Sequence, residues 1–262
     1  MSAGGVGVNA AARRPPPDAT AAMPRRALVT GASGDIGGAI ARRLAADGHH
    51  VACHAGSRLE RVLPLVDAIV AAGGSAEPVA FDVTDPDATT RACESLLAAG
   101  PIQILVNSAG INDDAVFPGM TRSQWARVID VNLNGFFNVT QPLTMPMLRT
   151  RWGRIVSLSS VAALMGNRGQ VNYAAAKSAL HGASKSLALE LASRGVTVNC
   201  VAPGIIEGSM TQGVFDQSTI DRIVPMKRMG RADEVAALVS FLASDAAAYI
   251  SGQVIAIDGA MA

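Results

Sequence analysis

Tyr173 and Lys177 are the residues whose types and spacing most directly suggest chemistry. They are four positions apart, so on a helix both side chains project from one face. Such a pair is more often a solvated helix face or a capped core tyrosine. Here, however, Ser160 ends a predicted strand and Asn132 lies in the preceding helical segment. These four residues together indicate a site for proton transfer.

Lys177 is expected to change the acidity of Tyr173. A phenol donates a proton readily near neutral pH only if its pKa falls from ~10 towards ~7, a change of about 4 kcal/mol. An ammonium about 4 Å away supplies on the order of 4 kcal/mol at an effective dielectric constant of 20. The charge of Lys177 is therefore sufficient in scale to lower the pKa of Tyr173 by this amount.

Short aliphatic runs alternate with amphipathic segments from Arg25 onward, and most runs are continuously apolar, as in strands covered on both faces. The expected strands are Ala27–Thr30, Val51–His54, Pro78–Phe81, Ile102–Asn107, Arg154–Ser159, Thr197–Ala202 and Val254–Ile257. Helices are expected to begin near Ile36, Arg58, Pro86, Thr121, Tyr173 and Ala232. The alternation predicts one α/β domain: a Rossmann-like, doubly wound parallel sheet of about seven strands, with right-handed crossovers and helices on both faces.

A glycine-rich turn joins the first strand to the first helix. Glycine lets the backbone approach a pyrophosphate closely, and the helix N-terminus offers free N–H groups. Many turns need glycine only for a positive φ, but the position directly after the first strand favours a dinucleotide. The residues of this turn that are expected to bind the cofactor are Gly31, Ser33, Gly34, Asp35, Ile36 and Gly37.

The end of the second strand indicates NADP(H) rather than NAD. Folds that bind NAD carry an acid about 20 residues after the glycine turn, to bind the ribose diol. No acid lies there; instead Arg58, with Ser57 and His54 nearby, would hold a 2′-phosphate through charge-assisted hydrogen bonds. The alternative is that Arg58 begins the next helix and faces solvent.

The predicted domain covers residues 25–262, and two segments differ from it in character: the stretch before it and one long connection within it. Residues 1–24 are rich in Gly, Ala and Pro, and we expect a disordered tail or an upstream start before Met23; a transit peptide is a weaker alternative. The segment at about 205–231 follows Pro203 and Gly204 without strand character, so it is expected to be a lid. A surface helix pair packed by methionines is the alternative for this segment.

Composition excludes several classes of function. A net charge of +1 with 16% charged residues gives no basic surface for nucleic acid. Three distant cysteines and four histidines show no metal-ligand spacing, so we expect no metal and no disulfide framework, which favours the cytoplasm. The uncharged stretch Val131–Leu148 contains Asn and Pro residues, so it predicts a buried helix rather than a membrane span.

Taken together, these features resemble the short-chain dehydrogenase/reductase family, from Arg25 nearly to the C-terminus. The segments that carry the resemblance are TGASGDIG at Thr30–Gly37, Asp82-Val83, NSAG at Asn107–Gly110, VNLNG at Val131–Gly135, the Ser160/Tyr173/Lys177 spacing and Pro203-Gly204. The implied catalytic tetrad is Asn132, Ser160, Tyr173 and Lys177.

The resemblance also implies a role for each of these residues. Tyr173 would protonate a ketone that a nicotinamide reduces, Ser160 would hold the ketone oxygen, and Asn132 would fix a water that relays protons through Lys177. The further cofactor contacts implied are Asp82 and Val83 at the adenine, Asn107, Ala109 and Gly110 at the adenosine ribose, Pro203, Gly204 and Ile206 towards the nicotinamide, and Tyr173 and Lys177 themselves.

Two positions depart from the family's pattern. Asp35 replaces the second glycine of the glycine motif, and an anion there would oppose a pyrophosphate unless it points away. Gly208 replaces a threonine that often binds the nicotinamide amide, and Ser209 is the candidate to take over that contact.

Within the family, the resemblance is greatest to the 3-oxoacyl-acyl-carrier-protein reductases, through Arg154–Ser160, Gly166–Lys177, Ser193–Gly204 and Tyr249–Gly252. It implies NADPH-dependent reduction of a 3-oxoacyl thioester in fatty-acid or related biosynthesis, and a homotetramer. It further implies docking of the acidic carrier protein at Arg151 and Arg194, which are otherwise ordinary surface charges. The alternatives are a reductase of acyl-CoA, a sugar or a small ketone or alcohol, and an inactive NADP-sensing binding protein on the same fold.

Overall fold

The computed structural model describes residues 24–209 and 211–262, so the expected N-terminal tail lies outside the described residues except for Pro24. Within these residues, seven strands form one sheet in the order β3-β2-β1-β4-β5-β6-β7, with every neighbouring pair parallel. The strands are β1 Arg26–Val29, β2 His50–His54, β3 Ser75–Val79, β4 Ile104–Asn107, β5 Gly153–Leu158, β6 Val196–Pro203 and β7 Val254–Ile257. The α-helices are α1 Asp35–Ala46, α2 Leu63–Ala71, α3 Pro86–Ala98, α4 Arg122–Ile129, α5 Gly135–Thr150, α6 Ala162–Met165, α7 Val171–Leu191, α8 Gln217–Ile223 and α9 Ala232–Ala243. The doubly wound α/β prediction is confirmed.

All seven predicted strands are present, but β3 begins three residues earlier than expected. It is an edge strand that pairs only with β2, with Cys53 opposite Pro78. Proline lacks a backbone N–H, and an edge strand tolerates it where a central strand would not. Phe81 follows the strand and packs on His54, with ring centroids 4.2 Å apart. Because β3 is only half-buried, its sequence lacks the continuous apolar run that marks the central strands.

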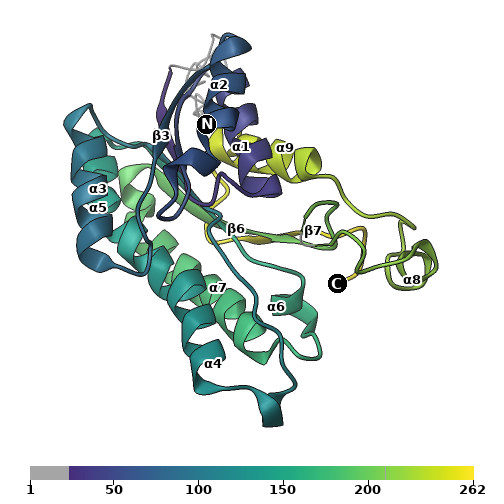
Figure 1. Ribbon diagram of the computed structural model, residues 1–262. Coiled ribbons are helices and arrows are strands. Elements are labelled where there is room, and N and C mark those ends of the chain that lie inside the picture. Colours follow the sequence, from purple (N-terminus) through teal and green to yellow (C-terminus); the bar gives the residue numbers. More distant parts are fainter. Residues whose placement is uncertain (1–23, 210) are drawn as a thin grey trace, which may run out of the picture.

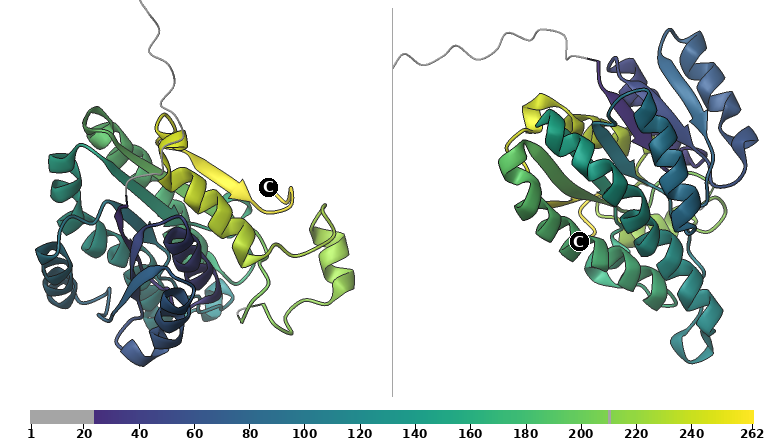
Figure 2. Two further views of the ribbon diagram at one scale, coloured as in Figure 1. Left: turned by 90° about the horizontal axis from the view of Figure 1, so that it is seen from above. Right: turned by 90° about the vertical axis from the view of Figure 1, so that its left-hand side faces the viewer.

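Helices cover both faces of the sheet (Figures 1 and 2). On one face α1 packs against α9, and their apolar residues share one buried cluster with residues of α2. On the other face α3 packs against α5, and these helices share a second buried cluster with α7. Continuous burial on both faces explains why the central strands are apolar throughout.

The connection from β6 to β7 departs from the expected right-handed rule. The connections from β4 to β5, from β5 to β6 and from β6 to β7 all run in the same direction along the sheet. The helices of the first two, α5 and α7, lie on one face, whereas α9 of the third lies on the other face. The last crossover therefore has the opposite hand to the others. Its helix instead packs on α1, where Val235, Val239 and Leu242 become fully buried beside Ile40. Burial of this apolar helix face outweighs the usual preference.

The helical stretch before β5 contains an irregular turn. As expected, Thr121 and Gln124 form a capping box at the start of α4. Asp130–Asn134 then form a π-helical turn that leads into α5, which contains Pro142 and Pro146. Among residues 24–209 and 211–262, none of the helices combines the length and apolar character that crossing a bilayer requires.

The segment 205–231 connects β6 to α9. Ile206 and Gly230 form an isolated parallel bridge near its two ends. Between them lies α8, capped by the Asp216 side chain, which stands away from the sheet in Figure 1 and in the left view of Figure 2. The expectation of no strand character holds for this segment except at the bridge.

Candidate active site

The glycine turn brings the start of α1 against the loop that follows β4. Gly31 has a φ of +67°, and a Cβ there would lie 2.8 Å from the Cα of Ala109. A Cβ on Gly37 would collide with the carbonyl oxygen of Gly31. Gly34 is the N-cap of α1 and offers no side-chain cap. The first N–H groups of α1 are thus left for a ligand, which fits an anion such as a dinucleotide pyrophosphate.

Two buried side chains hold this turn in place. His54, 1% exposed, accepts a hydrogen bond at Nδ1 from the backbone N–H of Gly31 (3.1 Å) and donates from Nε2 to the carbonyl of Phe81 (2.8 Å). Thr30 accepts at Oγ1 from the backbone N–H of Ser108 (3.0 Å). Burial lowers the pKa of His54, so the imidazole is neutral at pH 7. His54 therefore supports the turn. The sequence places it near a 2′-phosphate, but both of its ring nitrogens are already hydrogen-bonded to the backbone.

Tyr173 and Lys177 lie one turn apart near the start of α7, as their spacing predicts. Lys177 is 4% exposed, and its Nζ donates to the carbonyl of Leu158 at the end of β5 (2.8 Å). The same Nζ lies 5.7 Å from the centroid of the Tyr173 ring. The hydrogen bond to the carboxyl end of β5 thus holds the ammonium near the tyrosine ring.

The acidities of this pair differ from the expectation. Burial raises the pKa of Tyr173, although a hydrogen bond with Ser160 acts in the opposite direction. Burial also lowers the pKa of Lys177 to about 8. The net shift of the Tyr173 pKa is thus upward in this structure, because desolvation of the phenol dominates. At neutral pH the phenol carries its proton and most of Lys177 is charged.

Asn132 lies in the π-helical turn and is 3% exposed. Its Nδ2 donates to the carbonyls of Ile111 (2.8 Å) and Val128 (2.9 Å). Its Oδ1 is buried and has no hydrogen-bond partner among the described residues. A Cβ on Gly110 would lie 2.6 Å from that oxygen and 3.1 Å from Nζ of Lys177. The amide oxygen and the ammonium thus face the same glycine.

One cavity of about 440 Å³ gathers most of the predicted site. It lies at the carboxyl ends of β1, β4, β5 and β6, where ligands of doubly wound sheets bind. The predicted residues that line it are Gly31, Ser33, Gly34, Asp35, Ile36, Gly37, Gly110, Ser160, Tyr173, Lys177, Pro203, Gly204 and Ile206. The tyrosine, the lysine and the glycine turn therefore share one cavity.

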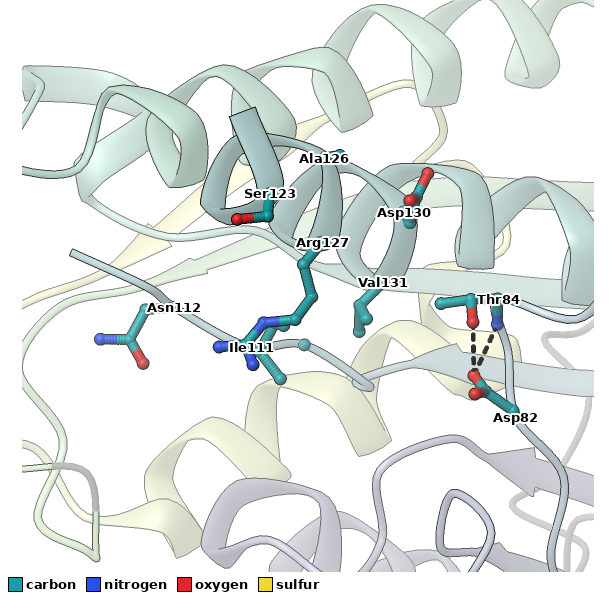
Figure 3. Close-up of a pocket in the computed structure, with 10 residues that line it drawn as sticks. Asp82, Thr84, Ile111, Asn112, Ser123, Ala126, Arg127, Asp130 and Val131 are labelled. Atoms are coloured by element: carbon teal, nitrogen blue, oxygen red, sulfur yellow. Dashed lines mark hydrogen bonds between the residues drawn. The ribbon is translucent and has the colours of Figure 1, made fainter. Parts of the chain in front are cut away.

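The remaining predicted contacts on this side lie in two adjoining cavities. A cavity of about 780 Å³ is lined by Asp82 and again by Gly110; Figure 3 shows Asp82 accepting hydrogen bonds from Thr84, with Arg127 projecting from α4. A small cavity of about 10 Å³ is lined by Lys177 and by the predicted residues Val83, Asn107, Ala109 and Asn132. Gly110 lines both the cavity of about 780 Å³ and the main cavity, and Lys177 lines both the small cavity and the main cavity.

The predicted 2′-phosphate contacts lie outside all three cavities. Ser57 and Arg58 are exposed in the turn after β2. Arg61, three residues further on, does line the main cavity together with Ser33 and Gly34. Sequence reasoning missed Arg61 because the short 3-10 helix Leu59–Arg61 that turns it towards the cavity has no pattern of its own.

The two departures from the family's pattern touch each other. The Asp35 carboxylate accepts hydrogen bonds from the backbone N–H (2.7 Å) and the Oγ (2.8 Å) of Ser209. Gly208, the other departure, packs directly against the same carboxylate. Neither contact was visible from the sequence pattern alone.

Arg151 and Arg194 come together, but far from the cavity. Arg151 donates to the carbonyl of Ser193 (3.3 Å), next to Arg194. Both precede their strands, β5 and β6, whereas Ser160 and Gly204 follow the same strands. The six residues of β5 span about 20 Å at ~3.3 Å per residue. The two arginines thus lie at the edge of the sheet opposite the cavity.

The cysteines and acidic groups give no sign of other chemistry. Cys53, Cys93 and Cys200 are buried, and burial raises the pKa of Cys53 to about 12 and of Cys93 to about 11. These values fit packing residues rather than nucleophiles. Across the described ranges, no three His, Cys, Asp or Glu side chains gather in a way that would hold a metal ion.

A doubly wound parallel sheet, an uncapped first helix, a half-buried tyrosine and a buried lysine meet at one cavity. This combination defines the class of dinucleotide-dependent oxidoreductases.

Comparisons with known proteins identify the family. A sequence profile described as "Enoyl-(Acyl carrier protein) reductase" matches residues 31–261. The chain is 43% identical to 3-oxoacyl-[acyl-carrier-protein] reductase FabG of Aggregatibacter actinomycetemcomitans over 91% of this chain and 100% of that protein. It is 44% identical to Nodulation protein G of Rhizobium sp. (strain N33), over 91% and 97% of the two chains. It is 42% identical to the FabG protein of Staphylococcus aureus (strain Mu50 / ATCC 700699), over 91% and 98%. The chain belongs to the short-chain dehydrogenase/reductase family, whose members are oxidoreductases that use a nicotinamide cofactor.

Proposed function

We propose that this chain reduces a 3-oxoacyl thioester, carried on acyl-carrier protein, to the 3-hydroxyacyl thioester with NADPH. The observation that carries the proposal is the cavity shared by Tyr173, Lys177 and the glycine turn. The similarity to reductases named for this substrate supports the choice of substrate.

Tyr173 supplies the proton in this proposal. The nicotinamide supplies the hydride when bound. The O–H bond of the phenol breaks as a new O–H bond forms on the former ketone oxygen, which Ser160 holds by a hydrogen bond. Because burial raises the pKa of Tyr173, the phenol is protonated at neutral pH and holds the proton that is to be transferred. Lys177, with a pKa of about 8, stabilises the phenolate that remains.

Asn132 completes the proton path. Its buried Oδ1 has no hydrogen-bond partner within residues 24–209 and 211–262, and Asn132 borders the cavity of about 10 Å³ that also touches Lys177. That volume is at the lower limit for one water molecule, ~10–15 Å³. A water bound to Oδ1 would return a proton to Tyr173 through the Lys177 ammonium.

NADPH is the proposed cofactor because the turn after β2 offers Ser57 and Arg58 where an NAD-binding protein would offer an acid. Both side chains are exposed, so they are accessible to a phosphate on the adenosine ribose. Arg61, inside the main cavity, adds a second positive charge for the part of the cofactor that NADH and NADPH share.

The carrier protein is proposed to dock at Arg151 and Arg194. Since these residues lie about 20 Å from the carboxyl end of β5, a carrier bound there on one chain would serve the cavity of another chain. A homotetramer, the proposed assembly, would provide that second cavity.

A spectrophotometric assay tests the function. NADPH oxidation is measured with a 3-oxoacyl carrier-protein substrate, its CoA thioester and a simple ketone at equal concentrations. We expect the highest kcat/KM with the carrier-bound thioester. A preference for the simple ketone would assign the chain to another activity of the family, and no oxidation with any of them would favour a binding protein.

A further inference from the structure

The carboxylate of Asp35 ties the start of α1 to a residue 174 positions later in the chain. Asp35 is the first residue of α1, and its Oδ2 accepts two hydrogen bonds from Ser209, one from the backbone and one from the side chain. Hydrogen bonds to a charged acceptor are the stronger kind. Ile206, Gly208 and Ser209 all line the main cavity, so this contact fixes part of the cavity wall.

Gly208 is the residue that lets Asp35 reach Ser209. A Cβ at position 208 would lie 2.5 Å from Oδ2 of Asp35 and 2.9 Å from its Cγ. Gly208 is not among the glycines with a positive φ, so its backbone conformation does not require glycine. The space taken up by the Asp35 carboxylate is what excludes a side chain there.

An acid in the first turn also favours a helix through the helix dipole, and this is the simplest alternative reason for Asp35. Asp87 has that position in α3. The dipole explanation accounts for the acid but not for the two hydrogen bonds to Ser209 or for the missing side chain at position 208. The two departures from the family's pattern are better explained together than separately.

We propose that Asp35 is a positioning residue: with Gly208 and Ser209 it forms an anchor that holds the 206–209 wall of the cavity against α1. The inference rests on the proposed function only in taking the cavity as the cofactor site. The anchor has an electrostatic consequence, because the carboxylate lies at the helix end that would otherwise attract a pyrophosphate. Asp35 therefore fixes the wall while weakening the binding of the cofactor.

Hydrogen–deuterium exchange of the full chain without cofactor tests the anchor. In Asp35→Ala the amide of Ser209 loses a charged acceptor, so we expect it to exchange about tenfold faster. Asp87→Ala is the matched control, since it also removes an acid from the first turn of a helix, and it leaves Ser209 exchange unchanged. Equal exchange rates in Asp35→Ala and the unaltered chain would overturn the proposal.

A double-mutant cycle separates the anchor from simple loss of charge. Gly208→Ala forces the Asp35 carboxylate away, so alone it should speed Ser209 exchange as much as Asp35→Gly does. Added to Asp35→Gly, the same change should have no further effect. Equal effects of Gly208→Ala in both backgrounds would show that the carboxylate is not what Gly208 accommodates.

Cofactor titration by fluorescence gives the electrostatic consequence. Asp35→Asn keeps the shape but removes the charge, so we expect the Kd for NADPH to fall several-fold while Ser209 exchange rises. An unchanged or higher Kd would refute the prediction that the Asp35 charge weakens the binding of NADPH. If the unaltered chain bound no NADPH, the proposed function would fail, whereas the exchange results would still decide whether the anchor exists.

Discussion

The proton-transfer end of the site and the proposed adenosine end are built in different ways. Lys177 and Asn132 are almost fully buried, and each donates hydrogen bonds to backbone carbonyls of neighbouring elements. Ser57 and Arg58 are exposed, and no hydrogen bond among the described residues involves either side chain. The fold therefore fixes the positions of the proton-transfer residues before any ligand binds. The residues proposed to select the cofactor have no fixed partners within the described residues and would gain them from the cofactor itself.

Removing the proton donor should produce the largest effect. Tyr173→Phe keeps the ring and its packing but loses the O–H group, so we expect kcat to fall by about 10²–10⁴-fold, the usual contribution of a general acid. Thermal unfolding and the Kd for NADPH should change little. Stopped-flow measurement of a single turnover checks the chemical step, and near-normal turnover would remove Tyr173 from its proposed role.

The pH dependence separates the two ends further, because only the buried end carries a strongly shifted charge. With a pKa of about 8, Lys177 loses its proton as the pH rises, so kcat for reduction should fall by about tenfold between pH 7 and pH 9. The pKa of Tyr173 is raised, so the phenol stays protonated over that range. Lys177→Arg keeps the charge at all these pH values, and its profile should lack the falling limb.

Stability should respond to the same titration in the opposite direction. The pKa of Lys177 is lower in the folded chain than its ordinary value of 10.5, so between about pH 8 and 10.5 the unfolded chain binds more protons. The contribution of Lys177 to the free energy of unfolding therefore rises with pH across this window. Denaturant titrations of the unaltered chain and of Lys177→Met at pH 7.5 and 9.5 isolate it, and a contribution that falls with pH would contradict the burial of a charged lysine.

At the exposed end the effect should be confined to cofactor choice. Arg58→Ala should raise the KM for NADPH by about tenfold, as expected for losing a hydrogen bond to a charged group, and leave the KM for NADH unchanged. Arg61→Ala, three residues away and inside the main cavity, is the matched variant and should weaken both cofactors alike. The reverse pattern would assign the 2′-phosphate to Arg61. Neither change should alter thermal unfolding, because both side chains are exposed.

The sequence predicts the frame of this protein better than its details. Continuous apolar runs identify the central strands, and the i,i+4 spacing identifies Tyr173 and Lys177, because both depend on local periodicity. The edge strand β3 begins earlier than predicted because it is only half-buried. The hand of the last crossover depends on how α9 packs against α1, which no local pattern contains.

The site shows the same limit. The glycine turn and the NSAG segment are recognisable motifs, whereas the bond from Asp35 to Ser209 joins residues 174 positions apart. Desolvation, which raises the pKa of Tyr173, depends on the packing around the phenol and reverses an estimate based on the Lys177 charge alone. Sequence reasoning therefore finds the groups that react but not the surroundings that set their acidity.

Carrier docking should produce the smallest effect of the substitutions considered, and it extends the comparison to a third region. Arg151→Glu together with Arg194→Glu should raise the KM for the carrier-bound thioester several-fold without changing that for the CoA thioester; Arg149→Glu is the neighbouring control. Added salt should act in the same way by screening.

The distance spanned by β5 gives a sharper test. Assemblies that mix Tyr173→Phe chains with chains carrying Arg151→Glu and Arg194→Glu should regain activity with a low KM, since a carrier docked on the first chain reaches the cavity of the second. Mixtures no better than the separate variants would confine docking and chemistry to one chain, which their positions at opposite edges of the sheet argue against.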